Sequence, residues 1–225
     1  MLILIAGAGA LGRELTRRLL DDGHDVVVVE ADEEVCDLVY AKDGAVTVHG
    51  DATDLRVLRD AGAKRADIVV TTMRSDSNNV ACALLARSLG AERIIGRLRD
   101  PTYEQAYREA GISHVVHVTR LMTHEIVTRI EHPEVSEVMT LHSEHTSVFS
   151  VEVAEGSWAS GRTVAEVAQH ERFPEECLLV GLILPDSTTS RIPGGDDRLR
   201  EGQTVLFITR PESVDDVTSF IAGRG

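Results

Sequence analysis

The sequence predicts an α/β protein with a doubly wound parallel sheet, a linking helix and a second, small α+β domain. Up to about residue 132, short β-branched runs alternate with amphipathic stretches, which is typical of βαβ units. A glycine stands just after several of these stretches, where helices commonly end. Beyond residue 132, strands follow one another between two helices, which indicates a separate α+β domain.

Six strands are expected in the first part. Each lies in an aliphatic or β-branched run, and apolar residues at helical spacing separate the runs. Six parallel strands joined by right-handed crossovers give a Rossmann sheet, with helices on both faces. We expect the strands at residues 2–6, 25–30, 45–48, 68–71, 93–97 and 114–117, and helices at residues 11–22, 33–42, 54–61, 77–89 and 102–110.

The pattern changes at residue 118. Residues 118–131 repeat apolar side chains every four positions, so we expect a helix with a broad apolar stripe that ends at His132 and Pro133. No strand follows for this helix to feed, so its stripe must be buried elsewhere. The predicted domains are residues 1–133, a polar linker at 134–146 and a small α+β domain at 147–225. In that last domain we expect strands at 147–154, 177–184, 190–192 and 204–209, and helices at 164–170 and 212–221.

Composition excludes several classes of function. Lys and Arg number 23 against 37 Asp and Glu, a net charge of −14, which disfavours nucleic acid as a partner. The three cysteines have neither CxxC nor zinc spacing, so we expect them reduced in a cytoplasmic protein. Every apolar run is far shorter than the ~18 residues of a membrane helix. We therefore expect any membrane role to depend on a partner.

The segment GAGALG, residues 7–12, is the strongest motif. It follows a predicted strand and opens a predicted helix, which is the context that gives a GxGxxG sequence its meaning. Gly7 allows the tight turn, Gly9 lets the backbone approach a pyrophosphate, and Gly12 lets helix and strand pack closely. Phosphate oxygens would then meet the free N–H groups at the helix N-terminus.

Polar residues at the carboxyl ends of other strands complete the expected site, because a doubly wound sheet binds ligands at that edge. Glu30 ends the second strand and is placed to accept hydrogen bonds from ribose hydroxyls, and it disfavours a 2′-phosphate. Asp51 can accept from an adenine amine or cap the next helix. Arg97 is the candidate phosphate contact, with an ordinary surface arginine as the alternative. Arg13 is either a substitute phosphate contact or a solvated helix charge, and its position on the first turn favours the surface charge. The full candidate set is Gly7, Ala8, Gly9, Ala10, Leu11, Gly12, Glu30, Ala31, Asp51, Ala52, Thr71, Thr72, Met73 and Arg97.

Taken in order, these motifs resemble a known family. GAGALG, VVVVEAD, VHGDATD, ADIVVTTMRSDSNNVACALLA, RIIGRLRDP and VTRLMTHEIVTRI are similar to the regulator-of-potassium-conductance (RCK) domains of TrkA and KtrA type, and SGRTVAEV with IPGGDDRLREGQTVLFI resembles their small C-terminal domain. Ala10 and Thr119 stand where ATP-activated KtrA members have an arginine and a cation-binding glutamate. The pattern is therefore closer to TrkA, and Arg97 matches the phosphate-contacting lysine of KtrA.

The resemblance implies a cytosolic, non-enzymatic subunit, peripheral at the inner face of the membrane, that binds an adenine nucleotide and gates a potassium-translocating membrane protein of TrkH or KtrB type. Candidate ligands are NAD or NADH, ADP and ATP. It also implies homodimers built across the helix at 118–131 and, with one domain pair per chain, an octameric ring.

Two other classes of function stay open from the residues. The glycine loop and Glu30 also suit a small NAD-dependent oxidoreductase, although the second domain lacks a Tyr-xxx-Lys pair. The same domains also serve as sensors for other cation transporters. His132, His142 and His145 crowd the linker, but their spacing matches no known ligand pattern, so no metal is predicted.

Overall fold

The computed structural model describes residues 1–133, 135–140, 146–171, 173–185 and 189–223. These residues form two compact units, Met1–Leu121 and Met122–Gly225. The division falls inside the linking helix, and the domain limits expected from the sequence stay a prediction. Within the described residues, no helix is long and apolar enough to span a bilayer.

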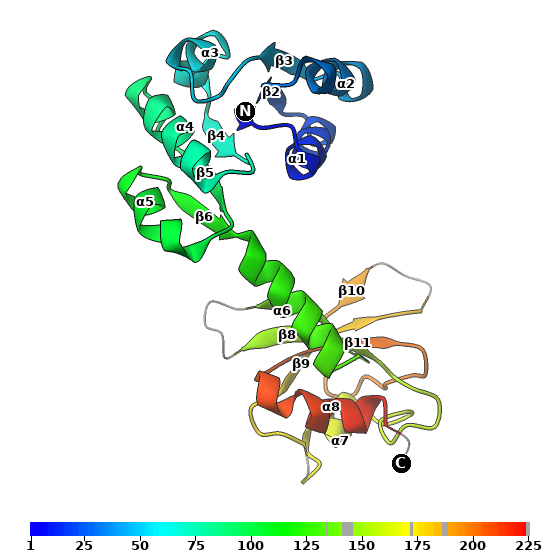
Figure 1. Ribbon diagram of the computed structural model, residues 1–225. Coiled ribbons are helices and arrows are strands. Elements are labelled where there is room, and N and C mark those ends of the chain that lie inside the picture. The colour runs from blue at the N-terminus through cyan, green and yellow to red at the C-terminus, as the bar shows by residue number, and fades with distance from the viewer. Residues whose placement is uncertain (134, 141–145, 172, 186–188, 224–225) are drawn as a thin grey trace. The chain divides into compact units, whose positions relative to one another are not determined.

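The first unit is built on a six-stranded parallel sheet with strand order β3-β2-β1-β4-β5-β6 (Figure 1). Its register is continuous, with Leu4 opposite Val27 on one side and Val69 on the other. The order reverses between β1 and β4, so the doubly wound topology predicted from the sequence is confirmed. The strands are β1 (Leu2–Ala6), β2 (Asp25–Glu30), β3 (Val46–His49), β4 (Ile68–Thr71), β5 (Ile94–Leu98) and β6 (His114–His117).

Helices cover the two faces of this sheet unequally (Figure 1). Ile5 and Val28 pack with Val39 under α1 and α2, and Leu4 packs with Leu58 and Ala83 under α3, α4 and α5. On the first of these faces, α1 and α2 lie over β1, β2 and β3, which leaves β4, β5 and β6 without a helix of the unit Met1–Leu121. The helices are α1 (Ala10–Asp21), α2 (Glu33–Asp43), α3 (Leu55–Asp60), α4 (Asp76–Ser88) and α5 (Glu104–Glu109).

Polar caps fix where these helices begin. Asp32, Asp54 and Ser75 each accept a backbone N–H bond from the first turn of α2, α3 and α4. Asp54 caps α3, rather than Asp51, which the sequence offered as a possible cap. Gly44 ends α2 at φ +70°, a conformation that glycine adopts without strain.

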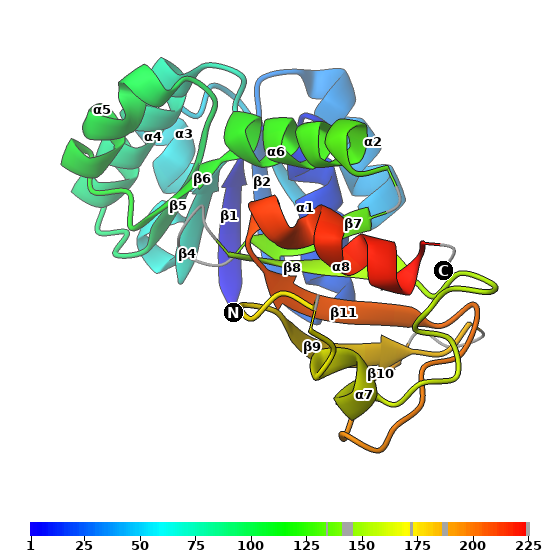
Figure 2. The ribbon, with the colours of Figure 1, turned by 90° about the horizontal axis from the view of Figure 1, so that it is seen from below.

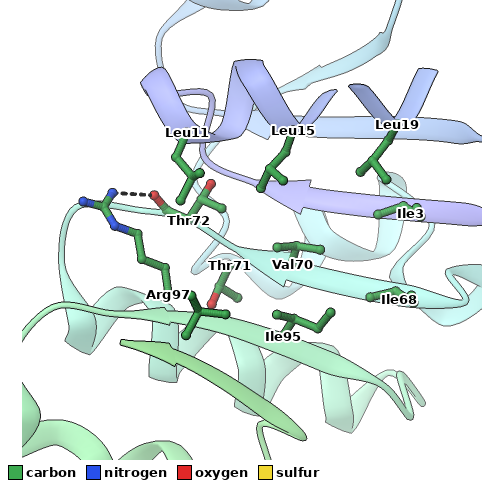
Figure 3. Close-up of a pocket in the computed structure, with 11 residues that line it drawn as sticks. Ile3, Leu11, Leu15, Leu19, Ile68, Val70, Thr71, Thr72, Ile95 and Arg97 are labelled. Carbon is green, nitrogen blue, oxygen red and sulfur yellow. Dashed lines mark hydrogen bonds between the residues drawn. The ribbon is translucent and has the colours of Figure 1, made fainter. Parts of the chain in front are cut away.

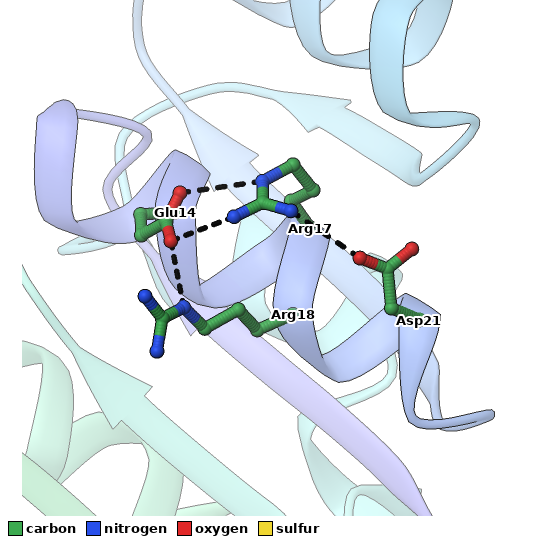
Figure 4. Close-up of polar contacts among 4 residues, drawn as sticks. All are labelled: Glu14, Arg17, Arg18 and Asp21. Carbon is green, nitrogen blue, oxygen red and sulfur yellow. Dashed lines mark hydrogen bonds and ion pairs between the residues drawn. The ribbon is translucent and has the colours of Figure 1, made fainter. Parts of the chain in front are cut away.

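The outer face of α1 is held by a network of charged side chains (Figure 4). Glu14 lies 2.8 Å from Arg17 and 2.6 Å from Arg18, and Arg17 lies 3.3 Å from Asp21. The two arginines hold the pKa of Glu14 below its usual value by hydrogen bonding. Because these groups are exposed and at helical spacing, they stabilise the helix modestly and carry no chemistry.

Helix α6 (Val118–Glu131) has the bounds expected from the sequence. Its stripe is exposed to solvent, with Met122 at 64%, Ile126 at 55% and Ile130 at 73% exposure. Large apolar side chains that are this exposed on one helix are typical of a surface that contacts another protein.

The second unit is a five-stranded antiparallel sheet of order β10-β9-β11-β8-β7 (Figure 2). Phe207 and Val205 of the central strand pack against Phe220 and Ile221 of α8 and against Val167 of α7, which gives this unit its own core. The predicted α+β domain is thus confirmed. Its elements are β7 (Val135–Thr140), β8 (Ser147–Glu152), α7 (Val164–Ala168), β9 (Leu178–Ile183), β10 (Ser190–Arg191), β11 (Thr204–Thr209) and α8 (Val214–Ile221).

One expectation differs from the structure. Residues 135–140 were expected in a polar linker, but they form strand β7, which pairs antiparallel with β8. The pairing shifts register between Glu137 and Met139, and this irregularity breaks the alternation by which a strand is recognised. Of the linker histidines, His132 lies 2.7 Å from Asp215, and His142 and His145 lie outside the described residues.

Loss of side-chain volume at the buried positions of β1 should destabilise the first unit. Leu4 is fully buried in the larger core cluster, so Leu4→Ala is expected to lower the free energy of unfolding by about 2–5 kcal/mol. Leu84→Ala, at a position on α4 that is 50% exposed, should change it by less than about 1 kcal/mol. Chemical denaturation followed by circular dichroism measures both. Equal effects of the two changes would show that Leu4 is not part of the core.

Candidate functional site

A cleft opens at the carboxyl edge of the parallel sheet, where the strand order reverses between β1 and β4. It has a volume of about 750 Å³ and is called the main cleft below. Doubly wound sheets bind ligands at this position. The main cleft is lined by Gly7, Ala8, Gly9, Ala10, Leu11, Arg13, Glu30, Asp32, Val35, Thr72, Met73, Arg74, Arg97 and Arg99.

The glycine loop between β1 and α1 is held by close backbone contacts. A Cβ atom on Gly12 would lie 2.0 Å from the carbonyl oxygen of Gly7, so only glycine lets α1 start this close to the loop. Gly7 itself has φ +103°, and a Cβ atom there would lie 3.1 Å from the side chain of Met73. The roles assigned to these two glycines from the sequence therefore have a direct geometric reason.

Gly9 has the opposite surroundings. It is exposed, and a Cβ atom there would have no neighbour within 4 Å. It is also the N-cap of α1, and no side chain caps the first turn of that helix. The first N–H groups of α1 thus face the main cleft together with the positive end of the helix dipole, which is the arrangement that binds a phosphate group.

Glu30 ends β2 and binds the loop from the other side of the main cleft. Its Oε2 accepts the Ala8 N–H at 2.6 Å, and its Oε1 accepts the N–H groups of Ala31 at 2.8 Å and Asp32 at 3.2 Å. A carboxylate has about four acceptor positions, so three N–H bonds leave roughly one for a hydroxyl donor. This geometry suits the ribose contact expected from the sequence.

Four arginines line the main cleft. Arg13 donates to the Ala8 carbonyl at 3.0 Å, Arg97 to the Thr72 carbonyl at 3.3 Å, and Arg99 to the Arg74 carbonyl at 2.9 Å. Within the described residues, none of the four forms an ion pair with a carboxylate, in contrast to Arg17 and Arg18 on α1. The Nε atom of Arg97 is also buried, and it has no hydrogen-bond partner among the described residues.

Sequence reasoning identified one of these four arginines. Arg97 lies one residue before the end of β5 and was predicted. Arg13 is half-buried at the cleft rather than a surface charge, and Arg74 and Arg99 were missed because they lie in the turns after β4 and β5, where no periodicity marks them. Their position just beyond two adjacent strand ends is the signal that would have found them.

The residues at the end of β4 and just after it do not all face the main cleft. Thr72 donates its hydroxyl to the carbonyl oxygens of Gly7 at 2.8 Å and Ala6 at 3.1 Å, which ties β4 to the glycine loop. Met73 packs against Gly7. Thr71 does not face the main cleft, and its buried hydroxyl has no partner among the described residues.

A side cleft of about 260 Å³ adjoins the main cleft and shares Gly7, Glu30, Met73 and Arg74 with it. Three predicted residues, Ala31, Asp51 and Ala52, line this side cleft. Asp51 accepts from the backbone N–H of Thr53 at 2.8 Å and from its hydroxyl at 2.7 Å, so it organises its own turn as well as facing the side cleft.

An apolar groove of about 270 Å³ lies beside the main cleft, between α1 and the uncovered strands (Figure 3). Leu15 and Leu19 of α1 face Val70 and Ile95 across it. Leu11, Thr72 and Arg97 line both the groove and the main cleft. In the described residues, no group of three or more His, Cys, Asp or Glu side chains is arranged to hold a metal ion.

Comparison with known proteins identifies the family. Residues 3–118 match the TrkA-N domain and residues 148–222 match the TrkA-C domain. The chain belongs to the TrkA family. It is a regulatory protein of potassium transport systems and not an enzyme, as the sequence predicted.

Individual relatives agree with this assignment. The Trk system potassium uptake protein TrkA homolog of Methanothermobacter thermautotrophicus is 26% identical over 99% of this chain and 100% of that protein. The homolog of Archaeoglobus fulgidus is 30% identical over 96% of this chain, which spans only 48% of it.

Solved structures share the fold. The GsuK channel bound to NAD has a TM-score of 0.65 at 22% identity, over 97% of this chain and 39% of that one. GsuK bound to ADP has a TM-score of 0.53 at 30% identity, over 56% of this chain and 34% of that one.

Two glycines of the loop should respond differently to the same added methyl group. Gly12→Ala places a Cβ against backbone, and overpacking of about 1–3 kcal/mol should lower the melting temperature of the first unit by roughly 5 °C or more. Gly9→Ala meets open space and should change it by less than about 3 °C. Calorimetry measures both. A Gly12→Ala protein as stable as the Gly9→Ala protein would contradict the packing described for the loop.

Proposed function

We propose that this chain binds an adenine nucleotide in the main cleft and uses it to gate a membrane-embedded potassium-translocating subunit of TrkH or KtrB type. The observation that carries the proposal is a set of four arginines around an open helix N-terminus, none of which has a carboxylate partner among the described residues. In a chain of net charge −14, such a set is explained by an anionic ligand with more than one charge. ADP, ATP, NAD and NADH all have at least two negatively charged phosphate groups.

The residues of the two clefts suit the parts of such a ligand. The N-terminus of α1 and the arginines suit the phosphates, and Glu30 suits a ribose while disfavouring a 2′-phosphate. The side cleft at Asp51 suits the adenine base. GsuK, which shares this fold, has been solved bound to NAD and bound to ADP. This supports an adenine nucleotide as ligand without selecting one.

We further propose that the chain forms homodimers through α6 and that four dimers assemble into an octameric ring at the cytoplasmic face of the membrane. The stripe of α6 is apolar and exposed, and the groove beside α1 is apolar and has no helix of its own unit. An α6 from a second copy would bury both surfaces at once. Because the groove shares Leu11, Thr72 and Arg97 with the main cleft, the dimer contact and the ligand would meet at these residues, which supports coupling between them.

Reversing the charge of Glu30, the proposed ribose contact, tests whether the main cleft binds an adenine nucleotide in the proposed way. Glu30→Arg removes the acceptor of the Ala8 N–H and of the expected ribose hydroxyl, so affinity for ADP, ATP, NAD and NADH should fall by roughly 100-fold or more. Isothermal titration calorimetry measures it, and circular dichroism checks the fold. Glu34→Arg, with the same charge change on the exposed first turn of α2, is the control and should bind like the unaltered chain. Unaltered affinity in Glu30→Arg would show that the ribose assignment is wrong.

Charged side chains placed in the apolar stripe of α6 test the proposed dimer contact. Replacing Met122 and Ile126 with Asp places two carboxylates in the proposed contact, which should weaken dimerisation by at least about 100-fold. Light scattering over a range of protein concentrations measures the shift to monomer. Thr123→Asp, on an exposed position of the same helix outside the stripe, is the control. A dimer that survives the double change would place the contact elsewhere.

A further inference from the structure

The first turn of α4 holds a buried polar cluster that touches both arginine-bearing turns of the main cleft. Asn79, with no exposed surface, accepts the Met73 N–H at 3.0 Å through Oδ1. Its Nδ2 donates to the carbonyl oxygens of Met73 at 3.2 Å and Arg97 at 3.1 Å. One amide therefore fixes the turn after β4 to the last residues of β5.

Asp76, one turn earlier on the same helix, fixes the chain beyond β5. Its Oδ1 accepts the Arg99 N–H and its Oδ2 the Asp100 N–H, both at 3.0 Å. The hydroxyl of Tyr107, a fully buried residue of α5, lies 2.8 Å from Asp76 Oδ1 and 2.6 Å from the Arg97 carbonyl oxygen. The carboxylate also lies at the N-terminus of α4, where the helix dipole favours a negative charge.

The cluster is fully engaged. Each of its three side chains has at least one hydrogen-bond partner on β5 or on the turns after β4 and β5. Burial, and secondly the neighbouring Asp76 carboxylate, raise the pKa of Tyr107, so its hydroxyl keeps its proton. Buried polar networks of this kind are rigid, because each lost partner leaves a desolvated group unsatisfied.

The segments that the cluster holds are those that carry the cleft arginines. Arg97 is the penultimate residue of β5, Arg99 follows the end of that strand, and Arg74 follows Met73, which packs against Gly7 of the loop. None of the three arginines is fixed by a carboxylate among the described residues, so the backbone that carries them decides where their guanidinium groups stand.

We propose that Asp76, Asn79 and Tyr107 are positioning residues for the phosphate groups of the ligand, because they set the distance between the arginines and the glycine loop. The proposal rests on the proposed function and deepens it. In this proposal, the cluster sets how much more tightly the main cleft binds a ligand with phosphate groups than one without them, although the cluster does not touch the ligand. The proposed contacts of the base and the ribose, Asp51 and Glu30, form no hydrogen bond with Tyr107 or the other two residues of the cluster.

Tyr107→Phe is the test, because it removes one hydroxyl and keeps the ring against Gly96. Adenosine, ADP, ATP and inorganic tripolyphosphate are titrated into the unaltered and altered chains, with binding followed by NMR chemical shifts. We expect adenosine affinity to stay within about twofold and the affinities for ADP, ATP and tripolyphosphate to fall about tenfold, as for the loss of one hydrogen bond in a charged network. Tyr103→Phe, a change of the same kind at an exposed position, should leave all four affinities unchanged.

A purely structural role would lower the affinities for adenosine and ADP by the same factor, and that result would overturn the proposal, as would unchanged phosphate affinities in Tyr107→Phe. If Tyr107→Phe does not fold, Asp76→Asn replaces it, since its amide can accept only one of the two N–H groups, and the same pattern is expected. An unaltered chain that binds tripolyphosphate but no adenine ligand would sink the proposed function alone. An unaltered chain that binds none of the four would sink both.

Discussion

The site depends on one close approach of backbone to backbone. Because residue 12 has no Cβ, α1 begins against the Gly7 carbonyl, and its first N–H groups point into the main cleft instead of into protein. The same carbonyl accepts the Thr72 hydroxyl, and the next residue, Ala8, donates to Glu30. A single turn thus ties together the ends of β1, β2 and β4, and a residue larger than glycine would separate all three.

The parallel sheet was predictable because its strands are buried on both faces where helices cover it, so each is a continuous aliphatic run with a glycine or polar turn after it. All six strands and the order implied by right-handed crossovers agree with the structure. β7 was not predictable in this way. An edge strand pairs on one side only, and the register shift after Glu137 removes the period of two on which recognition depends.

The site was predictable where a residue type is required by backbone geometry, as at Gly7 and Gly12, or by strand position, as at Glu30 and Arg97. It was not predictable where side chains reach the cleft from turns, as Arg74 and Arg99 do. Their only signal is their position just after a strand, and this does not identify a site by itself, because the function of a turn residue depends on which other strand ends beside it. Asp76, Asn79 and Tyr107 show the same limit, since residues 31 positions apart meet only in the folded chain.

The charge distribution follows from the same geometry. A chain with net charge −14 repels anions on average, so a polyanionic ligand is attracted only where cations are left unpaired. Arg17 and Arg18, on the outer face of α1, are paired with the carboxylate of Glu14, unlike the arginines of the main cleft (Figure 4). Arg97 is half-buried, and its Nε has no hydrogen-bond partner among the described residues, which costs stability. An anion that bound there, as proposed, would offset that cost. Since Arg97 also borders the apolar groove, the proposed ligand and the proposed dimer contact would act on the same side chain (Figure 3).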